Sequence, residues 1–229
     1  MRFIIIILCI LHTVLTYSQN VYQERLIPGI SDIDIEGGYN VHLIQGFEEK
    51  IVIETDQPKF LDAIDITNNS GSVIIRSRGI DGGGNYKVAL YVYFKNLDQI
   101  KARLFSNSMD TYTELNLDKL TLDINGAVNL NIFINCSDLT LKMNEIRSVY
   151  LQGYINGNAD IEISSIKKFY AVSLQVETLT ITCSEVKEAI VWVNKDINIT
   201  ASGAGSLTYK GNPAEGDMNI TPPFIINKK

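Results

Sequence analysis

Histidine serves as the base of most nucleophilic triads and as a common metal ligand, and this chain contains little of it. Of its two histidines, His12 lies in an apolar N-terminal leader that we expect to be removed, which leaves His42. His42 alternates with the apolar residues Val41 and Leu43, so we expect a strand position opposite in phase to them. We interpret His42 as a surface or partly buried structural residue, and we predict no catalytic residue, no metal site and no cofactor.

A pair of carboxylates could perform acid–base chemistry on a polysaccharide, and Asp123 and Glu162 are the candidates. If their segments stack in register, the two lie two layers apart, about 9–10 Å at the usual strand spacing. That separation is close to the one in inverting glycosidases. However, Lys142 falls between them, and alternating charge is ordinary on paired strands. We therefore favour an ion ladder, and a polysaccharide-active enzyme remains the second alternative.

Other chemistry-bearing features are sparse. The turn Gly82-Gly83-Gly84 lacks the lysine and the hydroxyl residue that follow in a phosphate-binding loop. Beyond the leader, Cys136 and Cys183 are too few for a disulfide framework and fall in different phases of the pattern described next, so we expect no disulfide. The net charge of −6, without a basic stripe, argues against nucleic acid as a partner.

The elements that position these residues repeat along the second half of the chain. Segments of alternating apolar and polar residues recur about every 20 residues, which suits one coil of a β-solenoid. They cover residues 100–104, 120–124, 139–143, 159–163, 179–183 and 197–201. Small or polar turns follow several of them, and a second alternating run comes after each turn. The sequence therefore predicts an all-β fold whose coils stack and bury one column of side chains each.

Stacking predicts which side chains point inward together. The first column is Leu104, Ile124, Met143, Ile163, Cys183 and Ala201. The second is Leu130, Val149, Phe169, Ala189 and Leu207, and beside it lie Tyr112, Ile132, Leu151, Ala171, Val191 and Tyr209. On one outer side we expect two polar columns: Lys101, Thr121, Thr140, Asp160, Thr180 and Asn198, beside Arg103, Asp123, Lys142, Glu162, Thr182 and Thr200.

The first half also alternates, with less regular spacing. Strands are predicted around residues 33–35, 41–44, 51–53, 73–75 and 88–94. We read residues 19–229 as a single domain. Within it, 19–96 form irregular coils and a cap, 97–213 the regular coils, and 214–229 a C-terminal tail.

The start of the chain is typical of an export signal. Arg2 precedes an apolar run over 4–15, and small residues stand at Thr16 and Ser18. We expect residues 1–18 to be a signal peptide and the mature chain to reach the periplasm or the cell surface. The run is shorter than the roughly 20 residues of a permanent span, so no transmembrane segment is expected after its removal. An uncleaved anchor is the alternative.

The other outer side is predicted to carry an apolar, aromatic strip. One of its columns contains Tyr150, Tyr170 and Ile190, and the neighbouring one contains Phe133, Val172 and Trp192, with Gln152 between. Exposed patches of this kind usually mark an interface or a ligand platform. Three alternatives remain: cover by the N-terminal strands or the Pro222-Pro223 tail, an interface with a protein partner or a second copy, and a carbohydrate platform.

Several motifs resemble the head GIN domain of putative autotransporter adhesins, a family of secreted proteins common in Bacteroidetes. They are Ile-Glu-Gly-Gly-Tyr-Asn-Val-His-Leu-Ile-Gln-Gly at 35–46, Ile-Val-Ile-Glu-Thr-Asp at 51–56, and the turns that end at 201–211. The resemblance covers nearly the whole mature chain. It implies a single right-handed β-helix and an adhesive role. The family's repeated Ser-Gly-Ala-Ser turn is approached only at 202–206, and has drifted around Glu145 and Glu185.

Together these observations predict a non-enzymatic secreted or cell-surface binding protein, adhesin-like, whose partner is a protein or a surface glycan. The residues expected to bind are those of the aromatic strip: Phe133, Tyr150, Tyr170, Val172, Ile190 and Trp192. The first alternative is a structural module that uses the same strip to form homo-oligomers.

Overall fold

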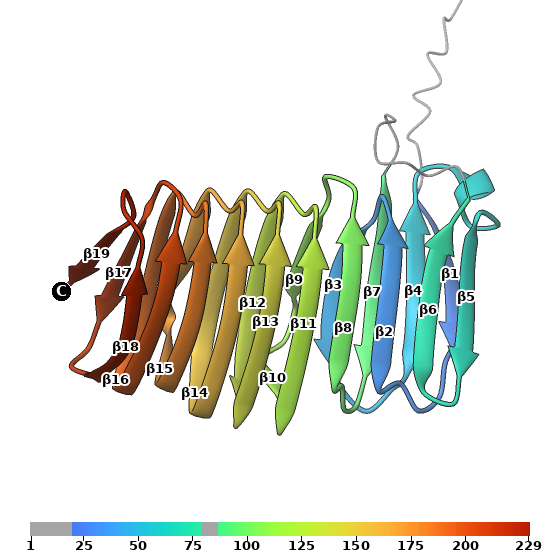
Figure 1. Ribbon diagram of the computed structural model, residues 1–229. Coiled ribbons are helices and arrows are strands. Elements are labelled where there is room, and N and C mark those ends of the chain that lie inside the picture. The colour runs from blue at the N-terminus through green and yellow to red at the C-terminus, as the bar shows by residue number, and fades with distance from the viewer. Residues whose placement is uncertain (1–19, 79–86) are drawn as a thin grey trace, which may run out of the picture.

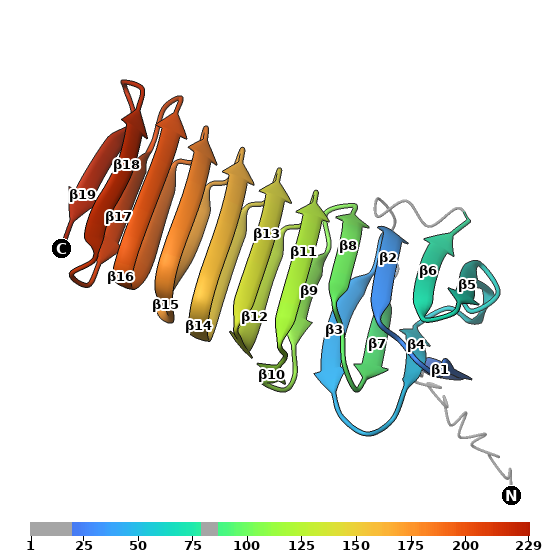
Figure 2. The ribbon, with the colours of Figure 1, turned by 60° about the horizontal axis from the view of Figure 1, so that its bottom comes forward.

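The computed structural model describes residues 20–78 and 87–229, and its strands stack into a β-solenoid. Figures 1 and 2 show the strands side by side from the β1 and β5 end to the β19 end. The predicted signal peptide, residues 1–18, and the turn Gly82-Gly83-Gly84 lie outside the described residues. Within them, no helix is long and apolar enough to cross a membrane. The all-β prediction with coils of about 20 residues is confirmed.

The strands form two walls that share one core, and the first is called wall A. Wall A contains β5 (Ile64–Asn69), β6 (Ser72–Ser77), β2 (Asp32–Gly37), β8 (Gln99–Leu104), β11 (Lys119–Asn125), β13 (Asp138–Asn144) and β18 (Ala214–Ile220). Three long strands complete it with their second halves, β14 (Ser148–Ser164), β15 (Lys168–Ser184) and β16 (Glu188–Ser202).

Wall B contains the first halves of β14, β15 and β16 and the remaining strands. These are β1 (Val21–Leu26), β4 (Lys50–Thr55), β7 (Val88–Phe94), β3 (Asn40–Gln45), β9 (Ser108–Thr111), β12 (Asn129–Cys136), β10 (Leu115–Asn116), β17 (Ser206–Lys210) and β19 (Ile225–Lys228). A 3-10 turn, η1 (Pro58–Phe60), links β4 to β5.

Period-two alternation produces the core, because every second side chain of a strand faces inward. In wall A, Ile124, Met143, Ile163, Cys183 and Ala201 pair in sequence as predicted, and all are buried. In wall B, the column from Leu130 through Val149, Phe169 and Ala189 to Leu207 is confirmed in the same way. Buried side chains form one continuous cluster along the whole stack.

Two side chains differ from the prediction near the start of the regular coils. Ala102, and not Leu104, pairs with Ile124, although Leu104 is buried. Tyr112 was predicted to point inward but is 59% exposed, and Met109 takes the inward place beside Leu130. The coil that joins β8 to β11 is longer than those that follow. The prediction applied the length of the later coils to this one, and it therefore placed Leu104 and Tyr112 at the wrong positions.

The two ends also differ from the regular coils. In the N-terminal part, parallel strands β2 and β3 join the stack, while β1–β4, β4–β7 and β5–β6 are antiparallel. The predicted tail over 214–229 is instead a further coil, since β18 pairs with β16 and β19 with β17. Strand β18 contains a glycine and many exposed residues, so its sequence does not alternate between apolar and polar residues. Phe224, between β18 and β19, is buried in the core.

Each regular coil passes from wall A to wall B through a turn with one residue in the left-handed region. In order these residues are Ser106, Gly126, Glu145, Ser165, Glu185 and Gly203, with φ between 54° and 80°. Their backbones are joined coil to coil: the N–H of Glu145 donates to Ser164 O at 3.2 Å, and that of Ser165 to Ser184 O at 3.0 Å. The turns at Glu145, Ser165 and Glu185, which lack glycine, therefore have the same left-handed conformation as the turns at Gly126 and Gly203.

Within the described residues, Cys136 and Cys183 are free and buried. Burial raises the pKa of the Cys183 thiol to about 12. For Cys136 the same cause, with Asp138 and Asp118 adding to it, raises the pKa to about 12. A thiol with so high a pKa is a poor nucleophile, so both residues act as small core side chains.

Candidate binding face

The outer surface of wall A is polar and pairs its own charges. Thr121, Thr140, Asp160, Thr180 and Asn198 form one row in register, as predicted. The predicted row that starts at Asp123 continues through Lys142, Glu162, Thr182 and Thr200. The first members are shifted, since Lys101 pairs with Asp123 and Arg103 with Asn125. Hydroxyl groups on a solvated sheet can hydrogen-bond to water, so the threonines of this surface need no partner from another molecule.

The candidate catalytic carboxylates Asp123 and Glu162 lie on this surface with Lys142 between them. The Nζ of Lys142 lies 3.9 Å from Oε2 of Glu162. Further toward the N-terminus, Arg76 pairs with Asp34 at 2.7 Å, and Arg103 lies 3.7 Å from Glu36. Acidic and basic groups thus alternate, which is the arrangement expected of an ion ladder.

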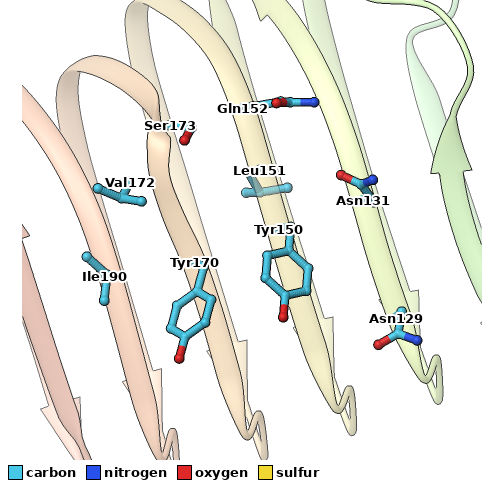
Figure 3. A pocket seen from close by; sticks show the side chains of 9 residues that line it. All are labelled: Asn129, Asn131, Tyr150, Leu151, Gln152, Tyr170, Val172, Ser173 and Ile190. Atoms are coloured by element: carbon cyan, nitrogen blue, oxygen red, sulfur yellow. The ribbon is translucent and has the colours of Figure 1, made fainter.

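The outer surface of wall B is different, because it carries aromatic rings. Tyr150, Tyr170 and Ile190 pair in sequence across β14, β15 and β16, as predicted. The two tyrosine rings meet edge to face with centroids 5.6 Å apart, and both point the same way along their strands (Figure 3). Tyr150 is 43% exposed. The hydroxyl of Tyr170 donates to Oε2 of Glu188 at 2.6 Å, which fixes that ring and raises its pKa.

These rings line an open hollow of about 680 Å³ in wall B (Figure 3). Its lining combines apolar and hydrogen-bonding groups: Asn129, Asn131, Tyr150, Leu151, Gln152, Tyr170, Val172, Ser173 and Ile190. None of these side chains is charged. Four of the six residues predicted for the strip therefore come together here: Tyr150, Tyr170, Val172 and Ile190.

The second predicted column does not form, because β15 contains register shifts. Phe133 pairs with Gln152 as expected, but Gln152 pairs with Ser173 instead of Val172. Trp192 pairs with Gln175 instead of Val172. Phe133 is partly exposed and does not line the hollow, and Trp192 is carried toward the corner where β15 and β16 pass into wall A.

Trp192 is held at that corner by a polar network. Its indole N–H donates to Oδ1 of Asn194 at 3.1 Å, and the amide of Asn194 donates to Oε1 of Glu177 at 2.9 Å. Lys195 lies 2.8 Å from Oε2 of Glu177, and the Tyr154 hydroxyl donates to Oε1 at 2.7 Å. Lys195, then Asn194 and Tyr154, lower the pKa of Glu177 to about 2. The geometry gives Trp192 a structural contact rather than a place beside Tyr150.

A second aromatic cluster on wall B was missed by the sequence reasoning. His42 stacks on Tyr91 with centroids 4.8 Å apart, and Tyr112 lies 4.7 Å from His42 and 5.8 Å from Tyr91. The Nδ1 of His42 lies 2.7 Å from Oδ1 of Asp110. The partly buried place predicted for His42 is confirmed. The alternation of residues 88–94 signalled an outward Tyr91, but nothing local indicated that β3, β7 and β9 would meet.

Carboxylate contacts fix this cluster as well. The Tyr91 hydroxyl donates to Oε2 of Glu54 at 2.6 Å, and the Tyr22 hydroxyl donates to Oε1 at 3.0 Å. The bond to Glu54 strongly raises the pKa of Tyr91. Among the described residues, no group of three or more histidine, cysteine or acidic side chains is placed to hold a metal ion.

Comparison with known proteins places these features in a family. The family model described as "Putative auto-transporter adhesin, head GIN domain" matches residues 30–213. No curated protein matches the chain significantly.

Several solved structures share the fold. A putative adhesin from Bacteroides fragilis superposes with a TM-score of 0.81 at 15% identity, covering 93% of this chain and 98% of that one. A putative lipid binding protein from Parabacteroides distasonis gives 0.63 at 14% identity, with 92% and 96% covered. A putative adhesin from Parabacteroides merdae gives 0.62 at 16% identity, with 92% and 96% covered. At these identities the likeness shows the fold alone.

Proposed function

Because the chain belongs to the family of putative auto-transporter adhesin head GIN domains, we propose that it is a non-enzymatic, exported, adhesin-like protein that binds a surface glycan. The proposed site is the hollow of wall B, around Tyr150 and Tyr170. Its location on the cell is proposed to be the periplasm or the outer surface, in keeping with the family and with the export signal of the sequence.

The lining of the hollow is the observation that supports this proposal. Two tyrosine rings held 5.6 Å apart offer flat apolar faces, on which the C–H faces of a sugar ring can stack. Around them, the amides of Asn129, Asn131 and Gln152 and the hydroxyl of Ser173 can donate and accept hydrogen bonds. None of the nine lining side chains is charged, and the charged groups of Glu188 and Lys168 lie beside Tyr170 without lining the hollow. Rings combined with neutral hydrogen-bonding groups match an uncharged carbohydrate better than an ionic ligand.

The non-enzymatic part of the proposal is supported by the state of the carboxylates. Asp123 and Glu162 are separated by Lys142, which pairs with Glu162 at 3.9 Å, and they lie on wall A, away from the hollow.

The test is a binding measurement on the purified mature chain, with a glycan array followed by calorimetry on the best neutral ligand. In the Tyr150→Ala/Tyr170→Ala variant, we expect affinity to fall at least about fivefold, because each ring contributes about 0.5–1.5 kcal/mol. The matched control is Thr140→Ala/Thr180→Ala, which changes two outward side chains of wall A and should leave binding unchanged.

Three outcomes would overturn the proposal. Undiminished glycan binding by the double tyrosine variant would place the site elsewhere. If no neutral glycan binds and light scattering shows an oligomer that the same variant converts to monomer, then the hollow is an assembly interface. Turnover of a polysaccharide that is lost in Asp123→Asn would likewise refute the non-enzymatic assignment.

A further inference from the structure

We infer that the glycan-binding surface extends from the hollow along wall B to the second aromatic cluster, so that the ligand is a linear neutral polysaccharide rather than one terminal sugar. This inference rests on the proposed function. The second cluster, called the His42 cluster, consists of His42, Tyr91 and Tyr112.

Strand pairing places the two aromatic groups in one row. Tyr91 pairs with His42, and His42 pairs with Asp110. Asp110 pairs with Asn131, and Asn131 with Tyr150, which pairs in turn with Tyr170. Because paired residues of neighbouring strands point to the same side, all six side chains face outward from wall B. The hollow and the His42 cluster are therefore two parts of one surface.

The spacing of the row fits a polymer. Neighbouring strands lie about 4.8 Å apart, so His42 and Tyr150 are separated by about 14 Å, and Tyr91 and Tyr170 by about 24 Å. One sugar ring cannot touch both aromatic groups across that distance, whereas a chain of several sugars can. Between the groups lie Asp110 and Asn131, whose oxygen and nitrogen atoms suit the hydroxyls of the intervening sugars.

The His42 cluster has the exposure and rigidity that a subsite needs. Tyr112 is 59% exposed and presents a ring to solvent. Tyr91 is anchored through its hydroxyl to Glu54 at 2.6 Å, and His42 through Nδ1 to Asp110 at 2.7 Å. Rings held in this way lose little rotamer freedom when a ligand binds, so more of the contact energy is retained in the affinity.

The outer surface of wall A differs from this row in the part of the chain that the structure describes. Its hollow near the N-terminus is lined mainly by ion pairs, among them Arg76 with Asp34 at 2.7 Å and with Glu36 at 3.5 Å. These groups already satisfy one another, and a neutral polymer would have to separate them.

The test measures affinity against ligand length in the full mature chain. The probes are neutral gluco-, xylo- and manno-oligosaccharides from disaccharide to octasaccharide, in whichever series the array shows to bind. We expect affinity to rise with length until the ligand reaches the His42 cluster. In Tyr112→Ala, the octasaccharide should lose about fivefold in affinity while the disaccharide is unaffected, because the two subsites act through one linked ligand. Phe47→Ala is the matched control, since Phe47 is 96% exposed in the loop between β3 and β4 and lies outside the row.

The outcomes separate this inference from the proposed function. If Tyr150→Ala/Tyr170→Ala abolishes binding but Tyr112→Ala has no effect at any length, the inference is wrong and the proposed function stands. If affinity is the same for every length, the inference also fails. If no neutral glycan binds, both fail together. Circular dichroism and melting of Tyr112→Ala exclude misfolding as the cause of a loss.

Discussion

Walls A and B are built from strands of the same coils, and their outer surfaces nevertheless differ in kind. Wall A presents threonines and alternating charges that pair with one another, as Lys142 does with Glu162. Wall B presents rings and amides, with Tyr150 and Tyr112 among the most exposed. The inward columns of both walls are equally buried. Burial in the core therefore constrains only the inward half of each strand, and the outward side chains can differ in kind between the two walls.

The sharpest comparison is between adjacent residues of β15 that point to opposite sides. Phe169 has no exposed surface, whereas Tyr170 lies on the outer surface. We expect Phe169→Ala to cost about 3–5 kcal/mol of unfolding free energy, because it leaves a cavity in the core. Tyr170→Ala should cost less than about 1 kcal/mol while reducing glycan binding. Urea unfolding of both variants measures the difference, and equal costs would show that Tyr170 belongs to the core.

A second difference is that register shifts interrupt wall B between Tyr150 and Gln152, whereas β13 pairs with β14 without a shift. Gly153 follows this shift with φ of 120°, and a Cβ there would lie 2.0 Å from Ile134 O. Gly153→Ala should therefore lower the unfolding free energy by more than about 1 kcal/mol and disturb the hollow. Gly46→Ala, where a Cβ meets nothing within 4 Å, is the control and should be nearly neutral. Similar melting temperatures for the two variants would contradict this account.

The smallest expected effect concerns the corner between the walls. Lys195, Asn194 and Tyr154 lower the pKa of Glu177 from 4.5 to about 2. The folded state therefore favours the carboxylate, and its contribution to stability is present above pH 4.5 and is lost as the pH falls toward 2. Glu177→Gln should melt at a lower temperature at pH 7, and the gap to the parent should narrow toward pH 2. A gap that does not change with pH would show that the charge of Glu177 is unimportant.

Much of the fold could be predicted because alternation reports directly on burial. The columns through Ile163 and Phe169 follow from residues that repeat at nearly constant spacing. Where the spacing changes, the prediction was wrong: the longer coil after β8 misplaced Leu104 and Tyr112. The final coil was taken for a tail because β18 does not alternate. The right-handed sense of the coil stays a prediction.

The binding face was only partly predictable for a related reason. Tyr150, Tyr170 and Ile190 recur at the repeat distance, so their column was visible in the sequence. The shift that moves Trp192 beside Gln175 coincides with a change of phase in β15, where the inward positions pass from Phe169 and Ala171 to Leu174 and Val176. Counting by a constant repeat length runs across this change, so Trp192 was assigned to the wrong column. The His42 cluster joins strands that are far apart in the chain, so no local pattern could reveal it.

Hydrogen bonds join each turn to the equivalent turn of the next coil, so successive coils are related by a nearly constant step along the stack. Duplication of the segment between Ser165 and Glu185 would return the chain to the same turn conformation, one layer further along the stack. It would also add one rung to the row of outward side chains on wall B. Under the proposed function, the number of coils would then set how many sugars the face spans, and that number could change by gain or loss of coils within the same fold.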